Sequence, residues 1–120
     1  MSSFSTREQS DAVIVVFDSA AGLNDFRNHA LRDELYDLVQ TRAEPHVALD
    51  LFKIDYLSSS GVAILVGLKR RVDTRNGKIV FFHVQPIVQD LLKVMKLDRY
   101  FPLADDEQAA IASLRPASTN

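Results

Sequence analysis

The chain has 120 residues, 47% of them apolar and 25% charged, which is the composition of a soluble globular protein with one core of ordinary size. Its formal net charge of −2 gives no basic field that would attract nucleic acid or anionic lipid, so neither is expected as a partner. The absence of cysteine excludes disulfides, zinc fingers and thiol nucleophiles.

The N-terminal sequence MSSFSTREQSDA has no apolar segment behind a positively charged start, so it does not predict a secretory signal. The longest apolar stretches are far shorter than the ~20 residues that span a bilayer. These features predict a cytoplasmic protein without membrane insertion, and no glycine-rich phosphate loop or other motif predicts a cofactor.

Apolar periodicity predicts alternating strands and helices. Ala12–Phe17 is a continuous β-branched apolar run, which predicts a strand buried on both faces. Asn24–Gln40 has leucines at helical spacing, which predicts an amphipathic helix. Val47–Phe52 predicts a second buried strand, and Gly61–Arg75 predicts a second helix, ended by the left-handed signal Asn76-Gly77.

The alternation continues in the C-terminal half. Lys78–Val84 predicts a third strand, and Pro86 marks the first turn of a third helix. The inner stripe of that helix is expected to contain Val88, Leu91, Leu92 and Met95. A short extended piece at Tyr100–Leu103 and a last helix at Asp105–Leu114 follow.

About four strands and about four helices with short connections predict a single compact α/β domain with a mostly parallel sheet. The termini are less regular. Residues 1–11 are expected to form an edge strand that includes Phe4 or to be flexible, and residues 115–120 to form a flexible tail.

Three consecutive serines, Ser58, Ser59 and Ser60, separate the second strand from the second helix. Serine is among the best N-cap residues, so Ser58 or Ser59 is expected to cap the helix that begins near Gly61. A cap uses one hydroxyl and leaves two. The alternative is therefore that one of these hydroxyls is presented to another molecule.

The helix after the serines is apolar at every position of Val62–Val66, so its apolar surface extends around the whole helix. A helix packed on a sheet buries one face, and part of this surface is expected to stay exposed unless a partner covers it. The more regular inner stripe consists of Val62, Leu65 and Leu68. Ala63 and Val66 are therefore predicted to contact a partner, and a phosphate on a nearby hydroxyl would change what this surface binds.

The segment VALDLFKIDYLSSSGVAILVGLKRRVDTRNGKIVFFHVQPIVQDLLKVMKLDRYF resembles the STAS domain, which is shared by anti-sigma factor antagonists and the cytoplasmic parts of sulfate transporters. The resemblance extends from about Ala12 to Leu114. Its most specific parts are the strand-to-helix junction with its serines, the Asn-Gly-Lys before an apolar strand, the helix start at Pro86 and the sequence LDRYF.

In bacterial antagonists of this family the junction is Asp-Ser-Ser-Gly or Asp-Ser-Thr-Gly. The first hydroxyl is phosphorylated by an anti-sigma factor that is also an ATP-binding serine kinase with a histidine-kinase-like fold. The resemblance implies that Ser59 is the phosphoacceptor, Ser60 the following hydroxyl and Gly61 the glycine. It implies a binding protein, not an enzyme, which sequesters the kinase, releases a sigma factor and loses this complex on phosphorylation.

Two residues depart from the family pattern. Ser58 stands in place of the acid, which bears on recognition by the kinase. Lys96 stands where a glycine often follows the third helix, which bears on the turn. The first departure supports a second hypothesis, a constitutive interaction subunit of a transporter or signalling complex without a phosphoswitch.

A third hypothesis is a serine hydrolase built from Ser59, His83 and Asp50, although the chain lacks the G-x-S-x-G motif. The histidines show no metal-ligand spacing, and His83 is expected to be a hydrogen-bonded structural residue. Asp50 and Asp55 flank the loop before the serines. Two carboxylates near a turn are more often capping or solvated groups than Mg²⁺ ligands, so no metal site is predicted.

The densest positive spot of the sequence is Lys69, Arg70 and Arg71. Three cations in a row within a helix are typical of a solvated face, and this is the expected arrangement.

Overall fold

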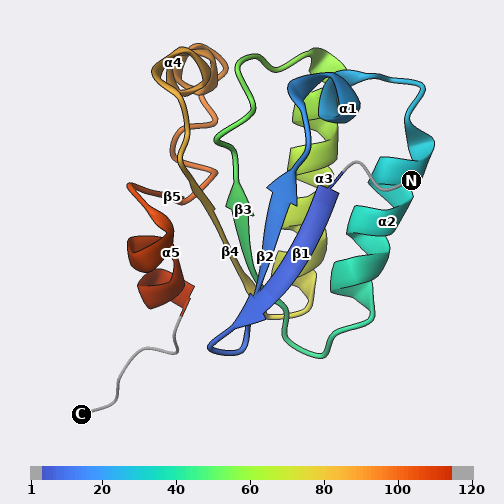
Figure 1. Cartoon of the computed structure of the whole chain (residues 1–120), viewed down its shortest axis with the longest axis vertical. Coiled ribbons are helices and arrows are strands. Elements are labelled where there is room, and N and C mark those ends of the chain that lie inside the picture. Colours follow the sequence, from blue (N-terminus) through green and yellow to red (C-terminus); the bar gives the residue numbers. More distant parts are fainter. Residues whose placement is uncertain (1–3, 115–120) are drawn as a thin grey trace.

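The computed structural model describes residues 4–114, which form one mixed sheet with helices on both faces (Figure 1). The elements in chain order are β1 (Phe4–Gln9), β2 (Ala12–Phe17), α1 (Ala20–Asn24), α2 (His29–Gln40), β3 (His46–Asp50), α3 (Ser59–Thr74), β4 (Lys78–Phe82), α4 (Pro86–Val94), β5 (Leu103–Ala104) and α5 (Glu107–Leu114). The predicted α/β class with a mostly parallel sheet is confirmed. The described residues hold five strands and five helices, one more of each than expected.

The strands are arranged in sequence order, β1-β2-β3-β4-β5. β1 pairs antiparallel with β2, and every later pair is parallel, with Val13 opposite Val47 and Val47 opposite Ile79. The turn between β1 and β2 consists of Ser10 and Asp11, whose φ values of 52° and 68° are those of a two-residue hairpin. Residues 1–11 were expected to form an edge strand or to be flexible, and β1 is that edge strand.

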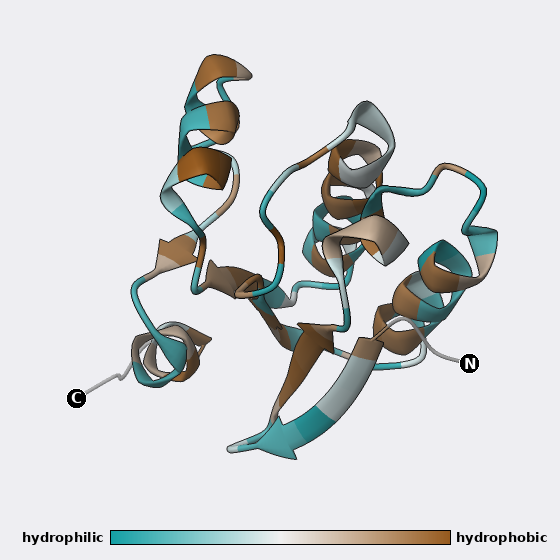
Figure 2. Cartoon of the chain, turned by 45° about the horizontal axis from the view of Figure 1, so that its top comes forward, coloured by the Kyte–Doolittle hydropathy of each residue, from teal (hydrophilic) through white to brown (hydrophobic). Residues whose placement is uncertain are grey.

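The two faces of the sheet carry two separate hydrophobic cores, because side chains alternate along each strand. On one face Val13, Val15 and Phe17 of β2 pack with residues of α1, α2 and α3. On the other face Ala12 and Ile14 pack against α5. The strand buried on both faces is thus confirmed, and Figure 2 shows the contrast between the brown β2 and β1, which is mostly pale and teal.

The single helix predicted at Asn24–Gln40 is wrong, because the segment holds the end of α1, a connection and α2. Ser19 caps α1 by accepting the N–H of Gly22 at 3.1 Å. After α1, Asp25 is extended, and Asn28 starts α2 by accepting the N–H of Leu31 at 3.2 Å. Side-chain capping at two points therefore overrides the continuous apolar period.

The second and third strands end two residues earlier than predicted. β3 stops at Asp50 because its carboxylate accepts the N–H of Phe52 at 2.9 Å and turns the chain out of the sheet, which leaves the Phe52 side chain 66% exposed. β4 stops at Phe82 because His83 has a φ of 55°, in the left-handed region.

The inner stripe of α4 is narrower than predicted. Val88 and Leu92 are buried, whereas Leu91 is half-buried and Met95 lies beyond the helix end and is exposed. The last helix begins at Glu107, two residues later than expected. The extended piece predicted at Tyr100–Leu103 is wrong except at its last residue, because Tyr100 lies in a turn and the strand β5 comprises only Leu103–Ala104. The tail at 115–120 and residues 1–3 lie outside the described residues. No helix within residues 4–114 has the length and apolar character required to cross a membrane.

The predicted stop after α3 is present, with Asn76 in the left-handed region at a φ of 57°. Gly77 has an ordinary φ. A glycine is needed there because a Cβ would overlap the carbonyl oxygen of Pro45. Lys96 ends α4 in the same left-handed way, with a φ of 59°. The N–H of Leu97 bonds the carbonyl of Leu92 at 2.7 Å, which is the Schellman arrangement.

Lys96→Gly is expected to stabilise the domain. The left-handed conformation costs a residue with a Cβ about 1–2 kcal/mol, and glycine avoids this cost. Glycine also makes the unfolded chain more flexible, and this entropy offsets about 0.5–1 kcal/mol of the stabilisation. We expect a net gain of about 0.5–1 kcal/mol in urea unfolding. The control Lys93→Gly, within α4, should lower stability by about 1 kcal/mol, and an equal loss in both variants would contradict the turn assignment.

Candidate functional site

The three serines lie at the N-terminus of α3, at the carboxyl end of the parallel strands, where α/β proteins commonly place their sites. Ser58 is the N-cap residue, and its hydroxyl oxygen accepts the N–H of Gly61 at 3.1 Å. Ser59 is the first helical residue and is exposed. Ser60 is half-buried and lines a groove next to the helix. The two capping candidates are thereby resolved in favour of Ser58.

Asn24, at the end of α1, connects this helix start to the rest of the fold and was missed in the sequence. It is the one buried polar residue within residues 4–114. Its side-chain oxygen accepts the backbone N–H of Ser58 at 2.6 Å, and its amide donates to the carbonyls of Ala20 and Tyr56, each at 2.9 Å. The Ser58 hydroxyl also lies 3.0 Å from the Asn24 carbonyl oxygen. Ser58 therefore caps α3 and is bonded to Asn24, whereas neither the Ser59 nor the Ser60 hydroxyl has a hydrogen bond within residues 4–114, and of these two Ser59 is the exposed one.

Gly61 is required at this junction because Asn24 approaches it closely. A Cβ on Gly61 would overlap the Asn24 side-chain oxygen and lie 3.1 Å from its Cγ. The glycine thus permits the contact between α1 and the first turn of α3, with no unusual backbone conformation.

We expect Ser58→Ala and Ser59→Ala to differ in stability. Ser58→Ala removes the cap and should cost about 1–2 kcal/mol in urea unfolding. Ser59 has no side-chain hydrogen bond within the described residues, so Ser59→Ala should change stability by less than about 0.5 kcal/mol. Equal costs would show that Ser59 shares the cap.

Several large apolar side chains are exposed on the connection between α1 and α2, on the loop before α3 and on α4. Phe26 lies between α1 and α2, Phe52 and Tyr56 lie on the loop before α3, and Ile87 and Val94 lie on α4. Their exposures range from 45% for Tyr56 to 79% for Val94. Figure 2 shows the brown patches on α4, which stands at the edge of the fold. An apolar surface of this kind is typical of a protein-binding site.

The predicted exposed side of α3 is confirmed in part. Ala63 is exposed, whereas Val66 is half-buried and packs against the core on the sheet side. Leu65 and Leu68 are buried as expected, but Val62 is only half-buried and Ile64 takes the more buried place. Ala63 is therefore the better of the two candidate contact residues.

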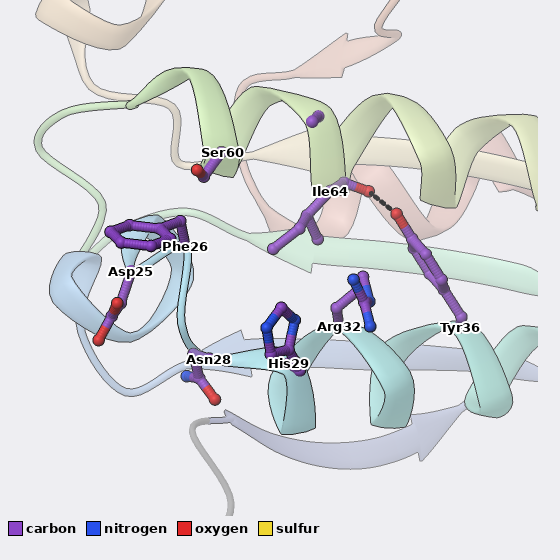
Figure 3. Close-up of a pocket in the computed structure, with 9 residues that line it drawn as sticks. Asp25, Phe26, Asn28, His29, Arg32, Tyr36, Ser60 and Ile64 are labelled. Atoms are coloured by element: carbon purple, nitrogen blue, oxygen red, sulfur yellow. Dashed lines mark hydrogen bonds between the residues drawn. The ribbon is translucent and has the colours of Figure 1, made fainter.

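A groove separates the first turns of α2 and α3 (Figure 3). This α2–α3 groove has a volume of about 200 Å³ and is lined by Asp25, Phe26, Asn28, His29, Arg32, Tyr36, Ser60, Ala63 and Ile64. At its far end the Tyr36 hydroxyl donates to the carbonyl of Ile64 at 3.2 Å, and burial raises the pKa of Tyr36. At the other end the backbone N–H of Arg27 lowers the pKa of Asp25 by hydrogen bonding.

The prediction of a solvated cationic face on α3 is wrong for two of its three members. The Lys69 ammonium pairs with Asp73 at 2.7 Å and lies over the ring of Tyr100. The Arg71 guanidinium lies 3.8 Å from the centre of the Tyr36 ring. Arg70 is exposed. Lys69 and Arg71 pack on aromatic rings because their long apolar stems suit such surfaces and the ring face attracts a positive charge.

His83 is hydrogen-bonded, as predicted, and lies just beyond β4. Its Nδ1 is 3.1 Å from a carboxylate oxygen of Asp50. The Ser59 hydroxyl has no hydrogen bond to His83 within residues 4–114, so the three residues do not form a nucleophile activated by a base. Asp55 is exposed, and no group of three or more potential metal ligands occurs within the described residues.

Comparisons with known proteins identify the family. The model of the STAS domain matches residues 3–110. The chain belongs to the STAS domain family. This confirms the resemblance found at the serine junction, and it places the N-terminal edge strand inside the domain.

Among relatives, the BtrV protein of Bordetella bronchiseptica is 28% identical over 76 residues, which cover 63% of this chain and 66% of BtrV. The anti-sigma F factor antagonist of Paenibacillus polymyxa is 23% identical over 105 residues, 88% of this chain and 90% of that protein. The unphosphorylated form of the antagonist SpoIIAA has the same fold, with a TM-score of 0.75, 17% identity, and coverage of 93% and 96%. The Bacillus SpoIIAA structure has also been solved in its phosphorylated form.

Proposed function

We propose that this domain is an anti-sigma factor antagonist that acts by binding another protein and is regulated by phosphorylation of Ser59. Its partner is an anti-sigma factor that is also an ATP-binding serine kinase with a histidine-kinase-like fold, and the complex forms in the cytoplasm. The single observation that carries this proposal is the different position of two adjacent serines: the Ser58 hydroxyl caps α3, and Ser59, the next residue, is exposed.

The start of α3 is suited to a phosphate. Its first turn contains no acidic residue, and the backbone N–H groups of Ser59 and Ser60 precede the first intrahelical hydrogen bond, which Val62 donates to the Ser58 carbonyl at 2.9 Å. A phosphate of charge about −1.5 to −2 at this end interacts favourably with the helix dipole. Modification is therefore compatible with the fold, and it adds negative charge at the exposed start of α3.

The relatives support the same function. The Paenibacillus relative is named an antagonist of an anti-sigma factor, and SpoIIAA exists in phosphorylated and unphosphorylated forms. Ala63, on the exposed side of α3, is the proposed contact of the described helix surface, with Val66 contributing through its partly exposed side.

A second candidate function is a constitutive interaction subunit of a transporter or signalling complex. One observation favours it: Ser58 replaces the family's acid, so the residue directly before Ser59 offers a kinase no carboxylate. The Ser58 hydroxyl performs the capping that an aspartate would perform, so the structure tolerates the replacement without a cost to the helix.

Phosphopeptide mapping of the protein from its native cells, grown under several conditions, tests the proposal. We expect phosphate on Ser59 in some conditions and none on Ser58. Phosphate on Ser58 or Ser60 alone would show that the register is wrong, and its absence under every condition would favour the constitutive subunit.

A further inference from the structure

We propose that the α2–α3 groove binds one apolar side chain of the partner protein together with a carboxylate from the same partner segment. This inference deepens the proposed function, on which it rests, because it names the chemistry of the partner's contact. The groove adjoins the serine junction through Ser60 but has its own walls in α2.

The size of the groove matches a side chain. Its volume of about 200 Å³ lies below the roughly 300–1,000 Å³ of sites that enclose small-molecule ligands. Ile64 forms an apolar part of its wall and is buried to 7% exposure, Ala63 is exposed beside it, and the Phe26 ring, 72% exposed, lies at the end of the groove. An apolar side chain inserted here would cover aromatic and aliphatic surface that water now contacts.

The charge available at the groove is positive. Figure 3 shows His29 and Arg32 extending from α2 toward α3. Arg32 pairs with its neighbour Asp33 at 3.1 Å, but that carboxylate is 68% exposed, and such pairs are weak. The Arg71 guanidinium lies 3.8 Å from the centre of the Tyr36 ring, so it is next to a residue that lines the groove but does not itself line it.

The carboxylate that lines the groove is already occupied. Asp25 accepts the backbone N–H of Arg27 at 2.9 Å as well as its Nε at 3.1 Å. The Arg27–Asp25 ion pair is exposed like that of Arg32 and Asp33, but the backbone hydrogen bond also holds the Asp25 carboxylate toward Arg27. A cationic partner segment would therefore face Arg32 without an available counter-charge. A partner carboxylate next to the inserted apolar side chain is the complementary chemistry.

The position of the groove couples its occupant to Ser59. Ser60 lines the groove, and Ser59 precedes it on the same helix turn. A phosphate on Ser59 would place like charge near the partner carboxylate and weaken binding. Phosphorylation of Ser59 would thus release an acidic partner segment from the groove.

Titration of the ¹⁵N-labelled full chain with the peptide acetyl-Gly-Glu-Leu-Glu-Gly-amide, followed by NMR, tests the inference. We expect amide shifts at Arg32, Ser60 and Ala63. Replacing the leucine of the peptide with alanine should weaken binding about 15- to 60-fold, because about two to three methylene equivalents leave the groove. Replacing both glutamates with lysine should abolish the shifts. Equal shifts with the lysine peptide, or shifts confined to other elements, would overturn the proposal.

Protein variants give the matched comparison. Arg32→Gln should weaken the glutamate peptide about two- to fivefold, the range of one exposed ion pair. Arg70→Gln, an equal charge change on the exposed side of α3, should leave it unchanged. Ala63→Trp should fill the groove and abolish the shifts. Equal effects of the two arginine changes, or binding of heparin to the same residues with the affinity of the peptide, would mean a general polyanion surface and refute the groove.

The peptide titration is independent of kinase and phosphate. Peptide binding without phosphorylation of Ser59 in cells would uphold the groove and refute the switch. Phosphorylated Ser59 without peptide binding would uphold the proposed function and refute the groove.

Discussion

Asn24→Ala is expected to lower the melting temperature by about 10 °C. The change removes the acceptor of the Ser58 backbone N–H and the donor to the Tyr56 carbonyl, both on the loop that leads into α3. A buried polar group without a partner costs about 1–3 kcal/mol, and because these two groups are only partly buried we expect the lower part of that range for each, a total of about 2–4 kcal/mol. For a domain of this size, each kcal/mol corresponds to roughly 4 °C. Differential scanning calorimetry measures the shift.

Two further variants separate this network from a general effect of helix substitution. Gln40→Ala, at the exposed end of α2, should change stability by less than about 0.5 kcal/mol. Gly61→Ala should destabilise nearly as much as Asn24→Ala, because its Cβ displaces the Asn24 side chain. A double variant that loses no more than either single change would confirm that both act on one contact. Additive losses would show that Gly61 is needed for another reason.

The sheet was largely predictable because its strands are buried and continuous. The bounds of Ala12–Phe17 are those of β2, and the three predicted strands are neighbours in the order expected from short connections. The errors occur where a polar side chain ends an element. Asn28 divides the predicted first helix, and Asp50 turns Phe52 out of the sheet. Local side-chain hydrogen bonds therefore set these helix and strand ends, which the periodicity of apolar residues did not reveal.

Only the part of the candidate site that is continuous in sequence could be predicted. The serine junction was visible as a sequence pattern, but α3 begins at Ser59, two residues before the predicted start at Gly61, and Ser59 is exposed there. Asn24 was not visible, because its partners lie up to 34 residues away and depend on how α1 packs against the loop. A buried asparagine at a helix end has no sequence signal of its own. The groove likewise depends on the pairing of α2 with α3.

Three variants of Ser59 test the switch, and the largest effect is expected for Ser59→Asp. The carboxylate lies at the first position of α3, where the helix dipole contributes about 0.3–1 kcal/mol, so the melting temperature should stay the same or rise slightly. At a partner interface that buries this position, an unpaired charge costs several kcal/mol. Because each 1.4 kcal/mol is tenfold in affinity, we expect at least a hundredfold loss of binding.

Ser59→Asn is the matched control, because asparagine has nearly the size and shape of aspartate without its charge. It should bind within about fivefold of the unmodified domain, and Ser59→Ala should bind in every growth condition, since it offers no hydroxyl to a kinase. The affinities are measured by isothermal titration calorimetry with the partner that copurifies with Ser59→Ala, after its identification and separate expression. If asparagine disrupted the complex as strongly as aspartate, side-chain volume at this position would control binding, and phosphate charge would lose its role. If Ser59→Asp still bound the partner, Ser59 would lie outside the interface, and the proposed phosphorylation switch would be refuted.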